Sequence, residues 1–169
     1  MSWETLNNAG DEGMSTKIEV GGANWTEAHL ELYQRTNGAE GHIVDFSRVG
    51  ASAETPCLIL KTTGRKSGEA KLLPLIYGQD GDNFVIVASK GGAPKHPAWY
   101  LNLAENPEVG FQVGAKKYRG NASTATGAER ERLFKMMAGV FPPYNAYQAK
   151  TDREIPVVVL EPGAEVEQL

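Results

Sequence analysis

The stretch PCLILKTTGRKSGEAKLLPLIYGQDGDNFVIVAS, residues 56–89, decides the fold. It contains three apolar runs of strand length, at 56–63, 71–77 and 83–89, and turn residues separate them. Gln-Asp-Gly-Asp at 79–82 joins the second run to the third, and an Asp-Gly pair between apolar runs is a strong hairpin signal. The stretch therefore predicts three strands, of which the last two form a hairpin.

Outward from this stretch, the sequence predicts helices and further strands. Helix signals occur at four places: from Thr26 to Asn37-Gly38, at 96–105 with Pro97 in the first turn, at 126–139 behind the capping box Thr126-x-x-Glu129, and from Pro142-Pro143 to Lys150. Strands are expected at 108–113, 117–124 and 155–160, while residues 39–55 show no clear period. Six strands linked mostly by hairpins or single helices favour an antiparallel barrel over alternating βαβ units.

Length and cysteine content limit the class of protein. A chain of 169 residues is expected to form one domain, residues 23–169, behind a flexible polar arm at 1–22. Cys57 has no disulfide partner, and its place in an apolar run predicts a buried structural thiol rather than a nucleophile. No apolar run is as long as a membrane span, and the N-terminus lacks a signal-peptide pattern. A cytoplasmic protein is therefore expected, with peripheral contact at the inner face of the membrane left open.

Charge is unevenly distributed along the chain. The net charge of −4 argues against nucleic-acid binding, which needs a basic surface. Between residues 61 and 95, however, Lys61, Arg65, Lys66, Lys71, Lys90 and Lys95 outnumber Glu69, Asp80 and Asp82. A local basic patch on an acidic protein suits a small anionic ligand. Neither a G-x-G-x-x-G after a strand nor Walker A spacing is present, so these two nucleotide-binding loops are not predicted.

Two loops could contact such a ligand. Thr63-Gly64-Arg65-Lys66-Ser67-Gly68 offers backbone N–H groups, a guanidinium fork, an ammonium and a hydroxyl. The alternative is a solvated basic hairpin, which Lys61 and Lys71 on the flanking strands make less favoured. Ala88-Ser89-Lys90-Gly91-Gly92 follows the third strand, and its glycines let a ligand approach the backbone. For this second loop the alternative is a flexible loop tip.

Aromatic residues follow these loops. The helix that starts near residue 96 can stabilise an anion at its N-terminus, and Trp99 and Tyr100 offer flat surfaces to a ring system. Tyr144 and Tyr147 lie three residues apart on a helix, so both can face one pocket, where a phenol can position an oxygen or deliver a proton. Packing in the core is the alternative for Trp99 and for both tyrosines. No set of spaced metal ligands and no nucleophile–base pair stands out, so neither metal binding nor hydrolysis is predicted.

Three segments, in this order, resemble the deazaflavin-dependent nitroreductase and F420H2-dependent quinone reductase family: KTTGRKSGEAKLLPLIYG, FVIVASKGGAPKHPAWYLNLAENPEV and FPPYNAYQAKTDREIPVVVLEP. The resemblance covers about 56–162. It implies an α+β, mainly β fold: a split β-barrel, related to flavin-binding barrels, of about six mostly antiparallel strands with flanking helices. It also implies reduced coenzyme F420 as a hydride donor and a quinone, nitroaromatic or activated enone as acceptor. Split barrels often pair, so a homodimer is left open, and the sequence does not decide the oligomeric state.

The resemblance also implies the site residues. Those expected to contact the cofactor are Arg65, Lys66 and Ser67 at its phosphate and oligoglutamate tail, Lys71, Leu72, Pro74 and Leu75 on a lining strand, Ala88, Ser89 and Lys90 near its ring, and Ala98, Trp99, Tyr100, Leu101 and Asn102 on the helix that completes the cleft. The catalytic, acceptor-side set is Ser89, Tyr144 and Tyr147. A nitroimidazole-reducing relative has tyrosine where Ile76 and Phe141 stand, so the acceptor side departs from that relative while the cofactor residues are kept.

The sequence thus predicts an F420-dependent oxidoreductase in which the protein supplies orientation and electrostatics and the cofactor supplies the redox chemistry. Two alternatives remain. One is a non-catalytic F420-binding or carrier protein with the same basic loops. The other is an FMN-dependent oxidoreductase on the related barrel.

Overall fold

The strand β3 (Thr55–Thr63) lies at the centre of the fold, because three other strands pair with it. These are β2 (Ile43–Val44), β4 (Ala70–Ile76) and β7 (Glu108–Val113), and all three pairs are antiparallel. The computed structural model describes residues 20–169, so the arm predicted at 1–22 lies almost wholly outside the described residues. Of that arm only its last residues are described, and Val20 among them is buried.

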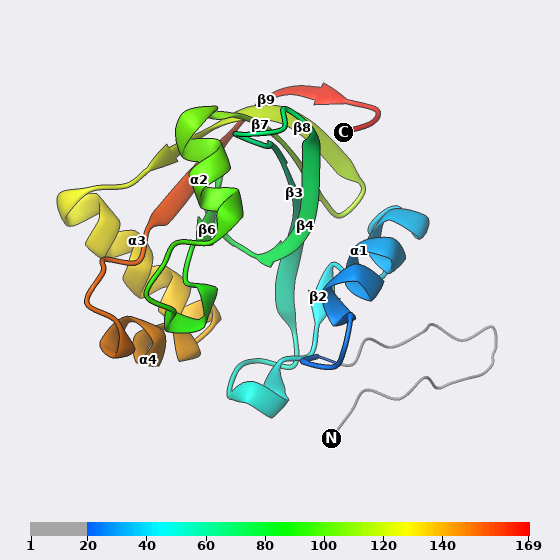
Figure 1. The fold of residues 1–169 in the computed structure, drawn as a ribbon. Helices are drawn as coiled ribbons and strands as arrows, with labels where there is room; N and C mark the ends of the chain where they lie inside the picture. The colour runs from blue at the N-terminus through cyan, green and yellow to red at the C-terminus, as the bar shows by residue number, and fades with distance from the viewer. Residues whose placement is uncertain (1–19) are drawn as a thin grey trace.

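The sheet has eight strands in the order β2-β3-β7-β8-β9-β6-β5, and β4 pairs with β3 off this path. The strands not yet named are β5 (Gly78–Asp80), β6 (Asn83–Val87), β8 (Lys116–Thr124) and β9 (Val157–Val166). All pairs are antiparallel, and the sheet curls into a half-barrel (Figure 1). This confirms the predicted mainly β split barrel. The two short strands β2 and β5 account for the difference from the six strands predicted.

Four α-helices flank the sheet. They are α1 (Trp25–Arg35) beside β4, α2 (Ala98–Glu105) over β3 and β8, and α3 (Gly127–Val140) and α4 (Pro143–Lys150) on the β6 side (Figure 1). Short 3₁₀ turns lie at Ser47–Val49 and Lys90–Gly92. No helix within residues 20–169 is long and apolar enough to cross a membrane.

The predicted hairpin between residues 71–77 and 83–89 is wrong, because the strand that pairs with β6 across the turn is not the one predicted. The Asp-Gly turn exists, with Gly81 at φ 62°, but it joins the three-residue β5 to β6. β4 instead pairs with β3 along seven residue pairs. At the start of β5 the chain passes close to α3, since a Cβ on Gly78 would lie 2.6 Å from the Met137 sulfur. The strand that enters the turn is therefore β5, which starts at Gly78.

Other boundaries also differ from the predictions. α2 begins at Ala98, and Pro97 is its N-cap in extended conformation rather than part of its first turn. Thr126 is the N-cap of α3, but no side-chain hydrogen bond caps that helix, so the predicted capping box is not formed. The last strand starts at Val157 and runs to Val166, beyond the predicted end, because β8 pairs with it over most of its length.

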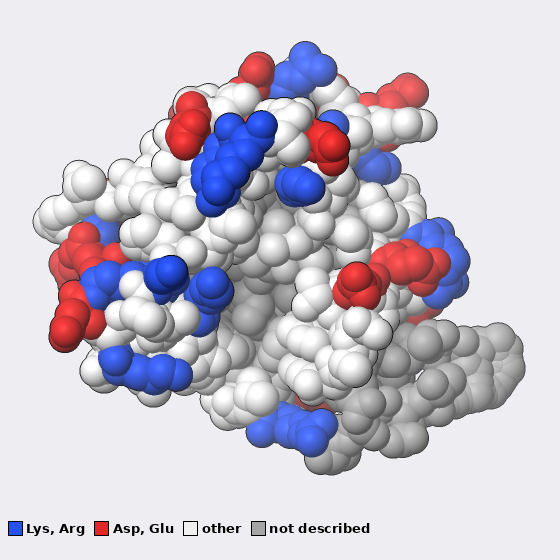
Figure 2. All heavy atoms as spheres, in the orientation of Figure 1, with Lys and Arg blue, Asp and Glu red and all other residues white. Residues whose placement is uncertain are grey.

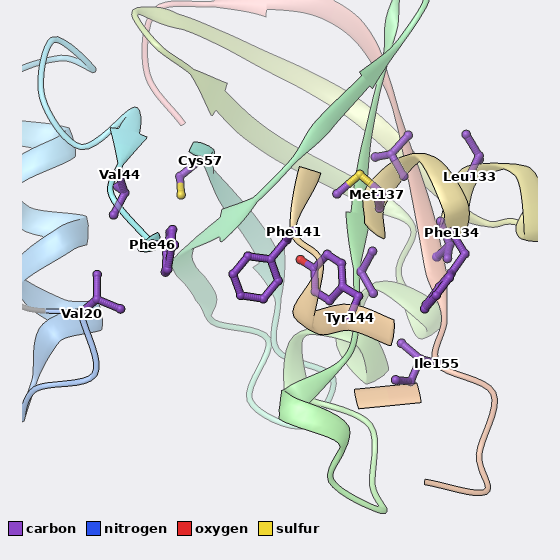
Figure 3. Close-up of a cluster of buried hydrophobic side chains, with 13 residues drawn as sticks. Val20, Val44, Phe46, Cys57, Leu133, Phe134, Met137, Phe141, Tyr144 and Ile155 are labelled. Atoms are coloured by element: carbon purple, nitrogen blue, oxygen red, sulfur yellow. The ribbon is translucent and has the colours of Figure 1, made fainter. Parts of the chain in front are cut away.

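Two apolar clusters fill the fold, one inside the half-barrel and one between β6, α3, α4 and the entry to α1. Figure 3 shows the second cluster, with Phe141 and Tyr144 side by side and the Tyr144 hydroxyl directed toward Phe141. Cys57 belongs to this cluster and is 1% exposed, which confirms the predicted burial. Loss of solvation raises the pKa of the Cys57 thiol to about 12.

Candidate functional site

A basic pocket of about 520 Å³ lies between the β3–β4 loop and α2. Its lining contains eight of the predicted cofactor residues: Arg65, Lys66, Ser67, Lys71, Leu72, Ala98, Trp99 and Asn102. Figure 2 shows Lys and Arg side chains above and to the left of a hollow in this face of the molecule. The sequence brings these cations together because β3 and β4 pair up to Thr63 and Ala70, which places the loop between them beside α2.

The β3–β4 loop is held by its own backbone. The Gly64 N–H donates to the backbone oxygen of Glu69 at 2.7 Å, and the Gly68 N–H donates to the backbone oxygen of Gly64 at 2.8 Å. A Cβ on Gly64 would lie 2.6 Å from the Ser67 hydroxyl oxygen, and Gly68 has φ +74°. The left-handed backbone at Gly68 favours glycine, and a side chain at position 64 would displace the Ser67 hydroxyl. The loop presents Arg65, Lys66 and Ser67 along one rim of the pocket.

Asn102 joins this loop to α2. The side chain is 5% exposed, and its Oδ1 accepts hydrogen bonds from the Arg65 backbone N–H at 3.1 Å and from Arg65 Nη1 at 2.9 Å. Its Nδ2 donates to Thr62 Oγ1 at 3.4 Å. The guanidinium is thus oriented before any ligand binds, which lowers the entropy cost of binding an anion there.

An apolar chamber of about 460 Å³ adjoins the basic pocket, and the two share Leu73 and Trp99 in their linings. Six further predicted residues line the chamber: Pro74, Leu75, Ser89, Lys90, Tyr144 and Tyr147. Residues 71–76 of β4 all line one cavity or the other. Within the described residues β4 pairs only with β3, so its second edge has no strand partner.

Tyr144 carries a free phenol at the chamber wall. It is 4% exposed, its ring lies 4.9 Å from Phe141 and 6.3 Å from Tyr147, and burial raises its pKa far above the ordinary value. Among residues 20–169 its hydroxyl makes no hydrogen bond. The phenol is therefore protonated at neutral pH and available as a hydrogen-bond donor.

The loop that carries Ser89 is built on left-handed backbone. Lys90, Gly91 and Gly92 have φ of 47°, 64° and 81°. A Cβ on Gly92 would lie 2.7 Å from the Tyr147 backbone oxygen, so glycine at 92 allows this loop to pack directly on α4. The loop and the two tyrosines of α4 therefore meet at the same end of the chamber.

Arg153 holds this loop from the other side, and the sequence interpretation missed it. Its guanidinium donates hydrogen bonds to the backbone oxygens of Ser89 at 2.6 Å, Ala93 at 2.8 Å and Ala88 at 3.3 Å. One guanidinium nitrogen also lies 3.0 Å from His96 Nδ1. Burial lowers the pKa of His96, and the positive charge of Arg153 lowers it further. His96 is thus the neutral partner of the guanidinium.

Three predicted cofactor residues lie outside both cavities. Ala88 is fully buried at the end of β6, and its oxygen accepts from Arg153. Tyr100 packs against the core of the half-barrel, and its hydroxyl bonds to Thr124 Oγ1 at 2.9 Å. Leu101 lines a separate basic groove, which Arg65 also reaches. In α2 the residues 98, 99 and 102 face the cavities while 100 and 101 do not, as the helical period requires.

The sequence interpretation also missed lining residues from distant segments. Trp25 and His29 of α1 and Phe46 line the chamber, with Leu73 from β4. The only available signal was the helix expected from Thr26 to Asn37-Gly38. Residues 20–169 contain no group of three or more His, Cys, Asp or Glu that could hold a metal ion.

Comparison with known proteins identifies the family of the chain. The sequence profile of the family described as F420H(2)-dependent quinone reductase matches residues 25–162. A Mycobacterium tuberculosis protein named F420H(2)-dependent quinone reductase is 40% identical over 135 residues, which are 78% of this chain and 86% of that protein.

The solved structure of an F420-H2 dependent reductase, FDR-A, is similar with a TM-score of 0.59 and 44% identity, over 63% of this chain and 94% of that chain. A solved structure described as a domain-swapped dimer is similar with a TM-score of 0.62 and 37% identity, over 82% of this chain and 98% of that chain. The chain therefore belongs to the F420H2-dependent quinone reductase family.

Proposed function

We propose that this F420-dependent reductase uses the basic pocket for the anionic part of coenzyme F420 and the apolar chamber for a small organic acceptor, with a quinone as the preferred class. The observation that carries the proposal is the shared wall of the two cavities, formed by Leu73 and Trp99. A planar ring with an anionic tail needs a flat apolar surface next to a cluster of donors, and an acceptor must lie against that ring.

The residues present match the chemistry of this cofactor. Arg65 and Lys66 would hold the phosphate and the tail carboxylates, since a guanidinium fork and an ammonium form strong charge-assisted bonds with such groups. Asn102 keeps Arg65 in place for this contact. Lys71, Leu72, Pro74 and Leu75 would line the ring along the open edge of β4. When bound, reduced F420 supplies the hydride.

Side chains at the far end of the chamber would manage the acceptor oxygen. The Tyr144 hydroxyl, which has no partner among the described residues, would donate a hydrogen bond to the oxygen that gains negative charge. Ser89 and Tyr147 lie at the same end and would complete the hydrogen bonding and protonation. Apolar walls formed by Phe46, Phe141 and other residues would exclude water and strengthen these contacts.

The walls also support the choice of acceptor. Ile76 and Phe141, the two positions at which a nitroimidazole-reducing relative carries tyrosine, both line the chamber. An apolar wall with few hydroxyls suits a quinone ring better than a nitro group, which carries concentrated negative charge on two oxygens. We therefore place quinones ahead of nitroaromatics and enones as acceptors.

Spectroscopic turnover tests the function directly. Reduced F420 mixed with the protein and a quinone should be oxidised, whereas reactions with a nitroaromatic or an enone should be slower. Tight F420 binding without acceptor-dependent oxidation would favour the carrier alternative. Tighter binding of FMN than of F420 would contradict the proposal altogether.

Tyr144→Phe should reduce turnover with quinones by roughly 10- to 100-fold and leave F420 affinity within about twofold, because the lost hydroxyl acts on the acceptor rather than the cofactor. The ring is kept, so the contact with Phe141 survives. Tyr118→Phe is the matched control, since Tyr118 lies on β8 outside the chamber. Wild-type turnover in Tyr144→Phe would remove this phenol from the mechanism.

A homodimer, which the sequence left open, belongs to the same proposal. One similar structure, at 37% identity, is described as a domain-swapped dimer, which supports pairing of this chain.

A further inference from the structure

Gln148 is a half-buried side chain of α4 that the proposed mechanism does not use. Both ends of its amide are hydrogen-bonded to the segment that follows the helix. Its Oε1 accepts from the Ile155 backbone N–H at 2.9 Å, and its Nε2 donates to the Arg153 backbone oxygen at 2.8 Å. One amide thus holds the chain at two backbone atoms, on either side of Glu154.

Arg130 of α3 fixes the orientation of this amide. Arg130 is 5% exposed, and its Nη2 donates to Gln148 Oε1 at 2.8 Å and to the Ile155 backbone oxygen at 2.7 Å. A guanidinium can only donate hydrogen bonds, so the Gln148 atom that faces it must be the amide oxygen. The amide nitrogen then faces the Arg153 backbone oxygen, which needs a donor. Arg130 and the backbone of Arg153 therefore agree on one orientation of Gln148.

Arg153, whose backbone Gln148 holds, connects this amide to the acceptor end of the chamber. Its Nη2 donates to the Ser89 backbone oxygen at 2.6 Å, and the same oxygen accepts from the Gly92 N–H at 2.9 Å. Gly92 in turn packs on the Tyr147 backbone. The contacts thus start on α4 at Gln148, pass through Arg153 and Ser89, and return to α4 at Tyr147. Ser89 and Tyr147 both line the chamber.

We propose that Gln148 is a positioning residue for the reduction. It holds the Arg153 backbone so that the guanidinium keeps Ser89 at a fixed place relative to Tyr144 and Tyr147. This inference rests on the proposed function, because these three side chains are the ones assigned to the acceptor oxygen. Gln148 lines neither the basic pocket nor the chamber, so its effect on turnover passes through Arg153. A displacement of about 1 Å at a reacting group lowers the rate by up to roughly 100-fold, which makes such support important.

Gln148→Glu removes the donor to Arg153 and keeps the shape of the side chain. One carboxylate oxygen still accepts from Arg130 and from the Ile155 N–H, whereas the other faces the Arg153 backbone oxygen with no hydrogen to donate. At saturating F420, kcat with a quinone should fall by roughly 10-fold and KM should change by no more than about twofold, because the chamber walls are kept. Asn145→Asp is the matched control, since it places the same charge on an exposed amide of α4, and it should keep the wild-type kcat.

A double-mutant cycle separates positioning from a general loss of stability. In an Arg153→Met background, Gln148→Glu should lower kcat by less than about twofold, because the side chain through which Gln148 acts is already absent. A merely structural role predicts the same loss of roughly 10-fold in both backgrounds. Losses that multiply in this way, or wild-type kcat in folded Gln148→Glu, would overturn the proposal. If Gln148→Glu does not fold, Gln148→Asn takes its place with the same expected losses, because its amide is one carbon too short to reach both backbone groups.

Amide hydrogen exchange tests the same contacts without any reaction. In the Gln148 variant the Gly92 N–H, which donates to the Ser89 oxygen, should exchange about 10-fold faster than in the wild-type chain. The Gly68 N–H, which donates to the Gly64 backbone oxygen in the β3–β4 loop, should exchange at the wild-type rate. Equal acceleration of the two amides, or none at Gly92, would contradict the positioning role. Absence of quinone reduction by the wild type would instead overturn the proposed function, and the exchange rates would still show whether Gln148 holds the loop.

Discussion

F420 should bind the variant Arg65→Ala/Lys66→Ala on the order of 10- to 100-fold more weakly than the wild-type chain, measured by direct titration. Each side chain would lose a charge-assisted contact with the phosphate or the tail, and each factor of ten corresponds to about 1.4 kcal/mol. Lys66 is exposed and Arg65 partly so, which keeps the effect below that of a buried pair. Raising the ionic strength should reduce the difference between the two proteins, because salt screens exposed charges.

The matched control removes the same charge elsewhere. Lys116→Ala/Arg119→Ala takes two positive charges from β8, whose residues do not line the basic pocket, and should leave F420 affinity within about twofold. If this control weakens F420 binding as much as Arg65→Ala/Lys66→Ala does, the loss of affinity is caused by the change in net charge and not by the loss of contacts in the basic pocket. Unchanged affinity of Arg65→Ala/Lys66→Ala at low salt would contradict the assignment of these residues.

Arg153→Met should lower the free energy of unfolding by about 2–4 kcal/mol, because three backbone oxygens lose their charged donor at once. Turnover should also fall, since Arg153 fixes the backbone of Ser89 at the acceptor end of the chamber. Arg153→Lys should recover only part of the stability, because one ammonium cannot reproduce the guanidinium fork. Chemical denaturation followed by circular dichroism measures the unfolding free energy of the two variants, and oxidation of reduced F420 by a quinone measures their turnover.

Lys150→Met is the control for Arg153→Met. Lys150 is the exposed last residue of α4, and its replacement removes one positive charge near the same loop. It should change the unfolding free energy by no more than about 0.5 kcal/mol. Should Arg153→Met unfold at the same denaturant concentration as Lys150→Met, the bonds of Arg153 would contribute nothing to stability.

Local patterns predicted most elements of this fold, and long-range contacts explain the exceptions. The strands at 108–113 and 117–124 agree with β7 and β8 within one residue, because apolar and turn residues mark their ends. The hairpin partner was wrong because β4 pairs with β3, which precedes it in the chain, and only the short β5 pairs with β6. No pattern within residues 71–89 contains that information.

The same distinction applies to the site. Arg65, Lys66 and Ser67 were found because glycines and cations adjacent in sequence form one loop. Arg153 was missed because its partners lie about sixty residues away and are backbone oxygens, which leave no mark in the sequence. Tyr100 was included as part of a continuous motif, although its place on α2 turns it toward β8. Family motifs identify a segment, whereas the helical period decides which of its residues reach a cavity.

The burial of Cys57 has a consequence for chemical damage. This thiol lines the chamber in which we place quinones, and quinones alkylate thiolates by conjugate addition. With a pKa of about 12 the Cys57 sulfur remains a thiol throughout the physiological pH range, and the thiol is a far weaker nucleophile than its anion. An enzyme built this way can turn over an electrophile many times beside its own cysteine without becoming covalently inactivated by it.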